Sequence, residues 1–233
     1  MAFRGDDFIS TKLTCVFDPM PKSRNPSAKK NRFVKAWMAE HVNDPWVKEA
    51  TRLGYRSRAA FKLIELGAKD KLFRSGLRAA DLGAAPGSWT QVLRERLGPN
   101  AEIVAIDVLP IDPIAGVRIV EADFRDNEGL ALLEAALGGR KLDLVVSDLS
   151  PNLSGVEAAD QARSVHLGEL ALEFSSAWLK PGGDLVVKAF QGEGFAELRR
   201  AVETHFTKVY VRKPKASRDR SREIYLVAKG LKS

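Results

Sequence analysis

After Gly76 the chain alternates short apolar runs with helical stretches. Seven runs have the length and the β-branched or apolar content of strands, and they lie at residues 77–83, 101–109, 116–124, 142–149, 184–190, 208–213 and 223–230. Four helical stretches separate most of them, at residues 88–98, 127–138, 160–180 and 193–206. This alternation predicts an α/β fold with a mostly parallel sheet flanked by helices. Because no helix separates the last two runs, we expect an antiparallel hairpin at one edge of a seven-stranded, Rossmann-like sheet.

The chain before Gly76 has a different pattern. Residues 1–30 contain scattered prolines and basic residues with no sustained period, which predicts a flexible basic arm. From Arg32 the pattern is helical, with Asp44 and Ser57 expected to begin the second and third helices. The predicted organisation is therefore an arm (1–30), an N-terminal helical segment (31–76) and a main domain (77–233).

Composition limits the compartment and the chemistry. No stretch is apolar enough for a membrane span and the start of the chain lacks an apolar signal core, so we expect a cytoplasmic protein without a membrane partner. The single cysteine, Cys15, excludes an internal disulfide and a multi-cysteine zinc site. The histidines His41, His166 and His205 lie far apart in helical segments, and we interpret them as structural. No metal site is predicted.

Charge is distributed unevenly along the chain. The net charge is +9 over residues 1–80, −9 over residues 81–206 and +7 over residues 207–233. Two basic ends around an acidic middle predict that the ends bind a polyanion while the middle has another role. Solvated charge on exposed faces is the plainer alternative.

Acidic residues gather where the predicted strands end, which is where open α/β sheets bind ligands. The first strand leads into "DLGAAPGSW", in which Gly83 and Gly87 allow a tight turn and close approach to a ligand. Asp107, Asp123 and Asp148 end the next three strands. Any one of them could be a turn or capping residue. Together they predict an adenosyl pocket, and Asp148 favours the cationic sulfonium of S-adenosylmethionine over the pyrophosphate of a nicotinamide cofactor.

Lys188 is a cation within the apolar stretch "DLVVKAF". An unpaired buried ammonium is costly, so this side chain needs a partner or a function. A lysine acts as a general base when burial and a neighbouring cation lower its pKa, and a ribose hydroxyl needs such a base. Lys62 is the candidate neighbouring cation, although a lysine there could also lie along the surface. Asp148 and Glu223 are expected to orient the two lysines.

These residues stand in motifs that resemble the FtsJ-type ribosomal RNA 2′-O-ribose methyltransferases of bacteria. The resemblance runs from about Arg32 to Lys229 and includes "YRSRAAFKL", "DLGAAPGSW", "SDLSPNLSG", "PGGDLVVKAFQGEGF" and "VRKPKASRDRSREIYLVA". It implies the Rossmann-like class I fold of S-adenosylmethionine-dependent methyltransferases, with Lys188 as proton acceptor. The implied catalytic tetrad is Lys62, Asp148, Lys188 and Glu223. The implied cofactor pocket is lined by Gly83, Gly87, Trp89, Asp107, Asp123 and Asp148.

The resemblance also implies a substrate, a uridine ribose in the A-loop of 23S rRNA presented on the 50S subunit, and hence a role in rRNA processing and ribosome biogenesis. Ser88 departs from the family, because many members have glycine there. We expect a monomer that binds no DNA.

A phosphate-binding track is predicted at Arg56, Arg58, Lys62, Arg212, Lys213, Lys215, Arg218, Arg220 and Arg222. A ribosome-assembly factor with secondary catalysis is the alternative, and a nicotinamide-dependent oxidoreductase is disfavoured because G-x-G-x-x-G is missing.

Overall fold

The structure is a computed structural model that describes residues 43–152 and 154–233. The predicted arm, the helix expected from Arg32, Cys15 and His41 lie outside the described residues. The described residues all belong to one compact unit. The two helices before the sheet therefore belong to the same unit as the sheet.

These two helices begin where the sequence predicts. Helix α2 (Pro45–Leu53) is preceded by Asp44, whose Oδ1 accepts a hydrogen bond of 2.9 Å from the backbone N–H of Trp46. Helix α3 (Ala59–Lys69) follows Ser57, whose Oγ accepts a bond of 3.2 Å from the first helical N–H. Asp44 is the N-cap of α2, whereas Ser57 stands one residue before the N-cap of α3, Arg58. Both side chains accept from donors that the helix itself leaves unpaired, which favours helix initiation there.

One seven-stranded sheet has the order β3-β2-β1-β4-β5-β7-β6. Its strands are β1 (Arg78–Leu82), β2 (Glu102–Asp107), β3 (Val117–Glu121), β4 (Leu142–Ser147), β5 (Leu179–Phe190), β6 (Phe206–Arg212) and β7 (Glu223–Leu231). The pairings from β3 to β5 are parallel, and β7 runs antiparallel to both β5 and β6. This confirms the predicted mostly parallel sheet and its antiparallel hairpin, with β7 placed second from the edge.

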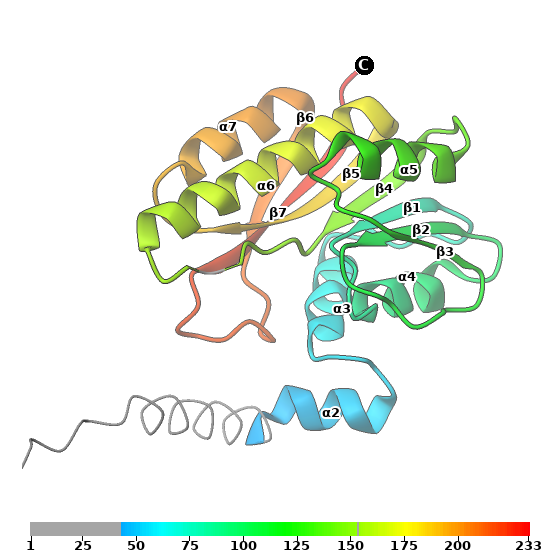
Figure 1. The fold of residues 1–233 in the computed structure, drawn as a ribbon, viewed down its shortest axis with the longest axis horizontal. Helices are drawn as coiled ribbons and strands as arrows, with labels where there is room; N and C mark the ends of the chain where they lie inside the picture. The colour runs from blue at the N-terminus through cyan, green and yellow to red at the C-terminus, as the bar shows by residue number, and fades with distance from the viewer. Residues whose placement is uncertain (1–42, 153) are drawn as a thin grey trace, which may run out of the picture. The chain divides into compact units, whose positions relative to one another are not determined.

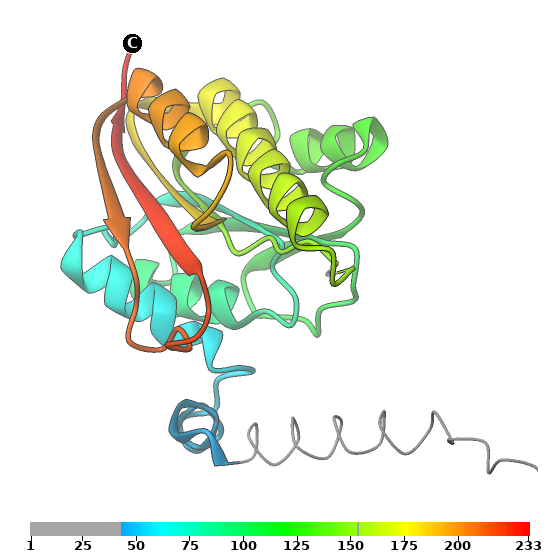
Figure 2. The same ribbon diagram turned by 90° about the vertical axis from the view of Figure 1, so that its left-hand side faces the viewer.

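Helices cover both faces of the sheet (Figures 1 and 2). They are α4 (Ser88–Leu97), α5 (Asn127–Leu137), α6 (Glu157–Trp178) and α7 (Phe195–His205), each within three residues of the predicted bounds. Helices α5, α6 and α7 lie on one face, whereas α3 and α4 lie on the other (Figure 1). The fold is thus a three-layer α/β arrangement.

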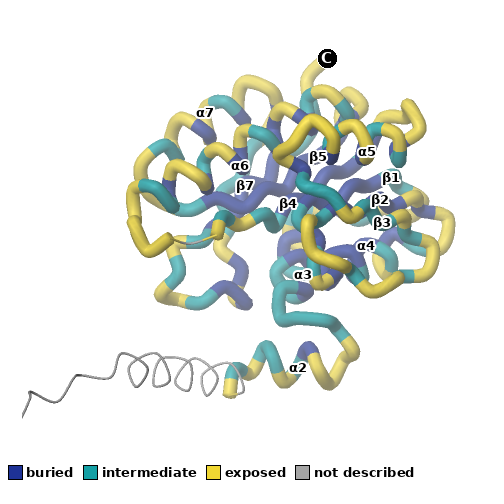
Figure 3. The backbone as a smooth tube through the Cα atoms, viewed as in Figure 1, coloured by how far each residue is buried: buried dark blue, intermediate teal, exposed yellow. Residues whose placement is uncertain are grey.

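Each face of the sheet has its own apolar core, and the five inner strands, β1, β2, β4, β5 and β7, are buried along most of their length (Figure 3). On the α3 and α4 side, Leu63 and Leu66 of α3 pack with Trp89, Leu93 and the ring of Tyr225. The buried positions of α3 recur at helical spacing, so one stripe of this helix is held against the sheet. Packing of that stripe fixes the adjacent polar positions of α3 at the carboxyl end of the sheet.

Candidate active site

The four predicted tetrad residues come together at the carboxyl ends of β4 and β5. Lys188 Nζ lies 2.8 Å from Asp148 Oδ1, donates to the carbonyl oxygen of Asp148 at 2.8 Å, and lies 4.0 Å from Glu223 Oε2. Lys62 Nζ, from α3, lies 2.7 Å from Glu223 Oε1. The Lys188 side chain is 7% exposed and those of the other three are 12–18% exposed. Two lysines and two carboxylates therefore form one sheltered, charge-balanced cluster.

Strand register explains why these residues meet. In the antiparallel pairing of β5 with β7, Lys188 is opposite Tyr225 and Phe190 is opposite Glu223. Side chains alternate along a strand, so Glu223 and Tyr225 share the face on which Lys188 lies. Asp148 follows directly after β4, the other neighbour of β5. The sheet supplies three members of the cluster and α3 supplies the fourth.

Tyr225 is a member of this cluster that the sequence analysis missed. Its hydroxyl donates to Asp148 Oδ1 at 2.7 Å and accepts from Lys62 Nζ at 3.2 Å, and the residue is fully buried. Burial, followed by the negative charges of Asp148 and Glu223, raises the pKa of Tyr225 well above its usual value, so the phenol stays protonated. Period-two alternation from Glu223 was the signal that would have placed it here.

Electrostatics keep Asp148 ionised. Burial alone raises the pKa of this carboxyl, but the ammonium groups of Lys188 and Lys62 and the hydrogen bonds from Lys188 and Tyr225 outweigh that effect. The net result is a pKa below the usual aspartate value. Asp148 is therefore an ionised acceptor that holds the Lys188 nitrogen in place and can stabilise it when it carries a proton.

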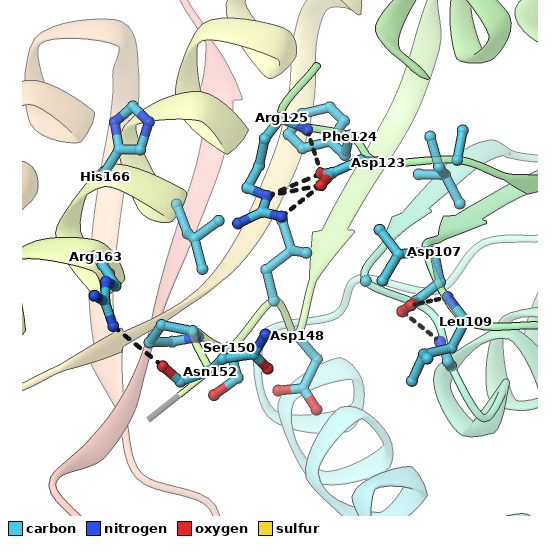
Figure 4. A pocket seen from close by; sticks show the side chains of 18 residues that line it. Asp107, Leu109, Asp123, Phe124, Arg125, Asp148, Ser150, Asn152, Arg163 and His166 are labelled. Atoms are coloured by element: carbon cyan, nitrogen blue, oxygen red, sulfur yellow. Dashed lines mark hydrogen bonds and ion pairs between the residues drawn. The ribbon is translucent and has the colours of Figure 1, made fainter. Parts of the chain in front are cut away.

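A cavity of about 540 Å³ opens beside the cluster, at the carboxyl ends of β1, β2, β3 and β4 (Figure 4). The predicted cofactor residues Gly83, Asp107, Asp123 and Asp148 all line it. Phe124, Arg125, Ser150, Asn152, Arg163 and His166 also contribute to the lining. The structure thus brings the three strand-end carboxylates to one cavity.

Two of these carboxylates already hold local structure. Asp107 accepts hydrogen bonds of 2.9 Å from the backbone N–H groups of Ala85 and Leu109, one on each carboxylate oxygen. Asp123 forms an ion pair with Arg125, whose hydrogen bonds lower the pKa of Asp123 against the opposing effect of burial. Asp107 thereby ties the glycine loop to the β2 end, and both side chains keep acceptor capacity for a ligand.

The glycine loop needs glycine at both predicted positions. Gly83 has φ +75°, and a Cβ there would lie 2.7 Å from the side chain of Leu149. Gly87 has φ +102°, and a Cβ there would lie 2.4 Å from Nη1 of Arg56. Such positive φ angles favour glycine as well. Gly87 caps α4 and does not line the cavity.

Trp89 is also placed away from the cavity lining. It is 2% exposed, its Nε1 donates to the carbonyl oxygen of Ala59 at 2.8 Å, and its ring lies 5.6 Å from that of Tyr225. Trp89 therefore packs from α4 against Tyr225, whose hydroxyl contacts Asp148 and Lys62. Ser88, the departure from the family pattern, is buried with its Oγ 2.7 Å from Ser57 Oγ, so its hydroxyl finds a local partner.

A second cleft, of about 450 Å³, also borders the cluster. It is lined by residues at and just before the start of α3 (Ser57, Arg58, Ala59 and Lys62), by the β6–β7 loop (Ala216, Arg218, Arg220 and Ser221) and by Glu223 at the start of β7. Asp148 lines the first cavity, whereas Lys62 and Glu223 line the second. The tetrad therefore lies at the junction of the two.

Much of the predicted phosphate-binding track has internal partners. Arg212 pairs with Asp70 at 2.6 Å, and Lys213 donates to the backbone carbonyl groups of Asp219 and Ser221. Similar partners hold Arg56 (Pro86 carbonyl), Arg58 (Asp44) and Arg222 (Glu157). These contacts stabilise the β6–β7 loop and its attachment to the ends of α2 and α3. The cations that line the second cleft are Arg58, Lys62, Arg218 and Arg220.

Within residues 43–152 and 154–233, no three His, Cys, Asp or Glu side chains are grouped so as to hold a metal ion. In the same part of the chain, no helix combines the length and apolarity that crossing a bilayer requires.

A Rossmann-like sheet with this strand order, a glycine loop and strand-end carboxylates defines the protein as a class I methyltransferase in fold. The sequence model of the FtsJ-like methyltransferases matches residues 55–231, and the chain belongs to that family. Two relatives are named ribosomal RNA large subunit methyltransferase E. The one from Azoarcus sp. (strain BH72) is 53% identical over 88% of this chain and all of its own. The one from Methylobacillus flagellatus is 54% identical over 85% of this chain and 95% of its own.

A solved structure agrees with this placement. A Plasmodium falciparum protein whose crystal structure is described as that of a ribosomal RNA methyltransferase superposes with a TM-score of 0.68. It is 31% identical in sequence and covers 76% of this chain and 98% of its own. Together the sequence and structural relatives confirm the predicted family and fold.

Proposed function

We propose that this methyltransferase uses S-adenosylmethionine to methylate a ribose 2′-hydroxyl of large-subunit ribosomal RNA, with Lys188 as general base. The observation that carries the proposal is the position of the Lys188 cluster at the junction of two cavities. A transferase of this kind needs a donor pocket and an acceptor pocket that meet at one base.

The first cavity fits an adenosyl donor by its chemistry. Three carboxylates at the strand ends line it: Asp107, Asp123 and Asp148. Carboxylates accept hydrogen bonds from hydroxyl and amine groups and attract a cationic group. Asp107 would accept from ribose hydroxyls and Asp123 from the adenine amine, with the Phe124 ring beside the base. S-adenosylmethionine, when bound, supplies an electrophilic methyl group on a cationic sulfonium, and Asp148 is the carboxylate we assign to that end.

Lys188 performs the proton transfer in this proposal. For this step Lys188 must be a neutral amine: the acceptor 2′-oxygen would form a bond to the methyl carbon as the carbon–sulfur bond of the donor breaks, and the hydroxyl proton would pass to the Lys188 nitrogen. The single positive charge of the donor then ends on the Lys188 ammonium, so that atoms and charges balance. The new ammonium lies between Asp148 and Glu223, which stabilise it without moving. Lys62 compensates the charge of Glu223 at 2.7 Å and links it through Tyr225 to Asp148. The cluster therefore orients the base and stabilises its protonated form.

The second cleft would hold the acceptor nucleotide. Arg58, Arg218 and Arg220 bring cationic groups to its wall, which suits the phosphates on either side of a ribose. The basic ends of the chain agree with a polyanionic substrate. The names of the relatives support ribosomal RNA of the large subunit, and within it we assign a uridine of the 23S A-loop in the 50S particle.

The test is transfer of labelled methyl from S-adenosylmethionine to 50S subunits purified from a strain that lacks this gene. Small subunits from the same strain are the control. Label on large-subunit RNA alone is expected. If the protein binds the subunits without labelling them, the proposal fails and an assembly factor with secondary catalysis takes its place. Binding of NADH in preference to S-adenosylmethionine would exclude the methyl donor altogether.

A further inference from the structure

Two basic side chains line the first cavity from α6 without a part in the proposed chemistry. Arg163 and His166 lie one helical turn apart, across the cavity from Asp107 and Leu109 (Figure 4). Their side chains are 54% and 63% exposed. S-adenosylmethionine carries no phosphate, and its one anionic group is the methionine carboxylate. A guanidinium at this edge suits that carboxylate or an anionic group of a second ligand, and the exposure of Arg163 to solvent favours the second ligand.

Arg163 is held only weakly by its neighbours. Its Nη1 lies 3.4 Å from the carbonyl oxygen of Asn152 and 3.5 Å from Asp160 Oδ1. Asp160 already accepts hydrogen bonds of 2.8 to 3.0 Å from Ser154 and Gly155. The Arg212 guanidinium, by contrast, makes a two-pronged contact with Asp70 at 2.6 and 3.0 Å. Arg163 thus retains donors for a partner outside the chain.

Two further acidic side chains of α6 belong to this region. Glu157, in the first turn of α6, pairs with Arg222 of the β6–β7 loop at 2.6 Å. Glu169 Oε2 lies 3.9 Å from His166 Nδ1, beyond hydrogen-bonding distance. The pair of Glu157 with Arg222 also joins α6 to the loop that lines the second cleft. The first turn of α6, the helix that carries Arg163 and His166, is therefore attached to the loop on the acceptor side of the site.

We propose that Arg163, with His166 beside it, binds a backbone phosphate of the RNA on the α6 side of the acceptor nucleotide. The RNA strand then crosses the site from the second cleft, past the tetrad, to α6. A planar guanidinium binds a phosphate through two parallel N–H groups, which matches the unused donors of Arg163. This inference rests on the proposed function, because it takes RNA as the substrate.

The test compares Arg163→Gln with Arg200→Gln, a control on α7 whose guanidinium is also exposed and pairs with Glu197 of its own helix. Binding to 50S subunits from the gene-deficient strain is measured over a salt series. Loss of one phosphate contact predicts an affinity lower by about five- to eightfold near 0.1 M salt. The slope of log affinity against log salt should fall by about 0.7 to 0.9. The control should match wild type, and Arg163→Lys should restore most of the slope.

S-adenosylmethionine affinity, measured by calorimetry on the same proteins, is expected to be unchanged. An unchanged salt slope in Arg163→Gln would overturn the inference, and so would a loss of S-adenosylmethionine affinity, which would assign the arginine to the cofactor. Either result leaves the proposed function intact as long as wild type methylates the subunits. Failure of wild type to bind or methylate them would overturn both.

Discussion

Asp81 offers a test of the electrostatics beneath the site. It lies in the buried part of β1, its Oδ2 accepts a hydrogen bond of 2.6 Å from Thr90, and among the described residues its Oδ1 has no partner. Burial raises the pKa of Asp81 to about 7, the Thr90 hydrogen bond opposes the rise, and the charges of Asp148 and Asp107 add to it. The folded protein therefore holds a proton here that the unfolded chain releases near pH 3.8.

The sign of the effect follows from proton binding. Between about pH 3.8 and 7 the unfolded state binds fewer protons than the folded state, so stability falls as pH rises. Roughly three pKa units at 1.36 kcal/mol each make the full loss about 4 kcal/mol. Between pH 5 and the folded-state pKa of about 7, two of these units remain, so the loss of stability over that range is about 2.7 kcal/mol. An Asp81→Asn protein cannot lose this proton, so its stability relative to wild type should rise by about that amount from pH 5 to 8.

The assay is urea unfolding followed by tryptophan fluorescence at several pH values in that range. Comparison between pH values removes any constant effect of the substitution. Asp112→Asn, at an exposed loop position, is the matched control and should show a difference from wild type that does not vary with pH. A difference between Asp81→Asn and wild type that is equally constant would refute the reasoning, because it would mean that the folded state ionises Asp81 as readily as the unfolded chain does.

Three other predictions concern the glycine loop and the basic residues. Gly83→Ala should lower S-adenosylmethionine affinity about tenfold or more by calorimetry, because the added methyl group has no space and φ is positive; unchanged affinity would show that the loop adapts. Arg212→Ala should lower the free energy of unfolding by about 2 to 3 kcal/mol by leaving Asp70 unpaired, with the salt dependence of RNA binding retained. Charge reversal at Arg218 and Arg220 should weaken RNA binding and flatten its salt dependence, and an unchanged slope would remove this loop from the RNA footprint.

The fold could be predicted because its elements are locally encoded. Apolar runs separated by helical periods define each βαβ unit, and caps such as Asp44 define where helices begin. The start of β5 could not be predicted. This strand begins at Leu179, and its register against β4 shifts, so that Leu142 pairs with Leu179 but Leu144 pairs with Asp184. The irregular stretch contains Pro181, which lacks a backbone donor, and that pairing depends on β4 and not on local sequence.

The candidate site was predictable where topology alone sets position. Carboxyl ends of parallel strands share one edge of a sheet, so Asp107, Asp123 and Asp148 had to lie near one another. Side-chain pairing depends on three-dimensional packing, so the partners of individual charged residues could not be predicted from the sequence. Arg212 was predicted to face RNA, but Asp70, which follows directly after α3, lies beside it. Tyr225 was overlooked because an aromatic residue in an apolar strand reads as core until its hydroxyl meets Asp148.

The most direct test of the account is the position of the methyl group on the RNA and its dependence on Lys188. Labelled subunit RNA is hydrolysed with alkali, which cannot cleave next to a methylated 2′-oxygen, and Lys188→Ala is run beside wild type with S-adenosylmethionine affinity measured for both. If Lys188 is the base for ribose methylation, wild type places the label in an alkali-resistant dinucleotide, and Lys188→Ala binds the cofactor without transferring methyl. Label on a base would exclude ribose methylation, and transfer by Lys188→Ala at the wild-type rate would exclude Lys188 as the base.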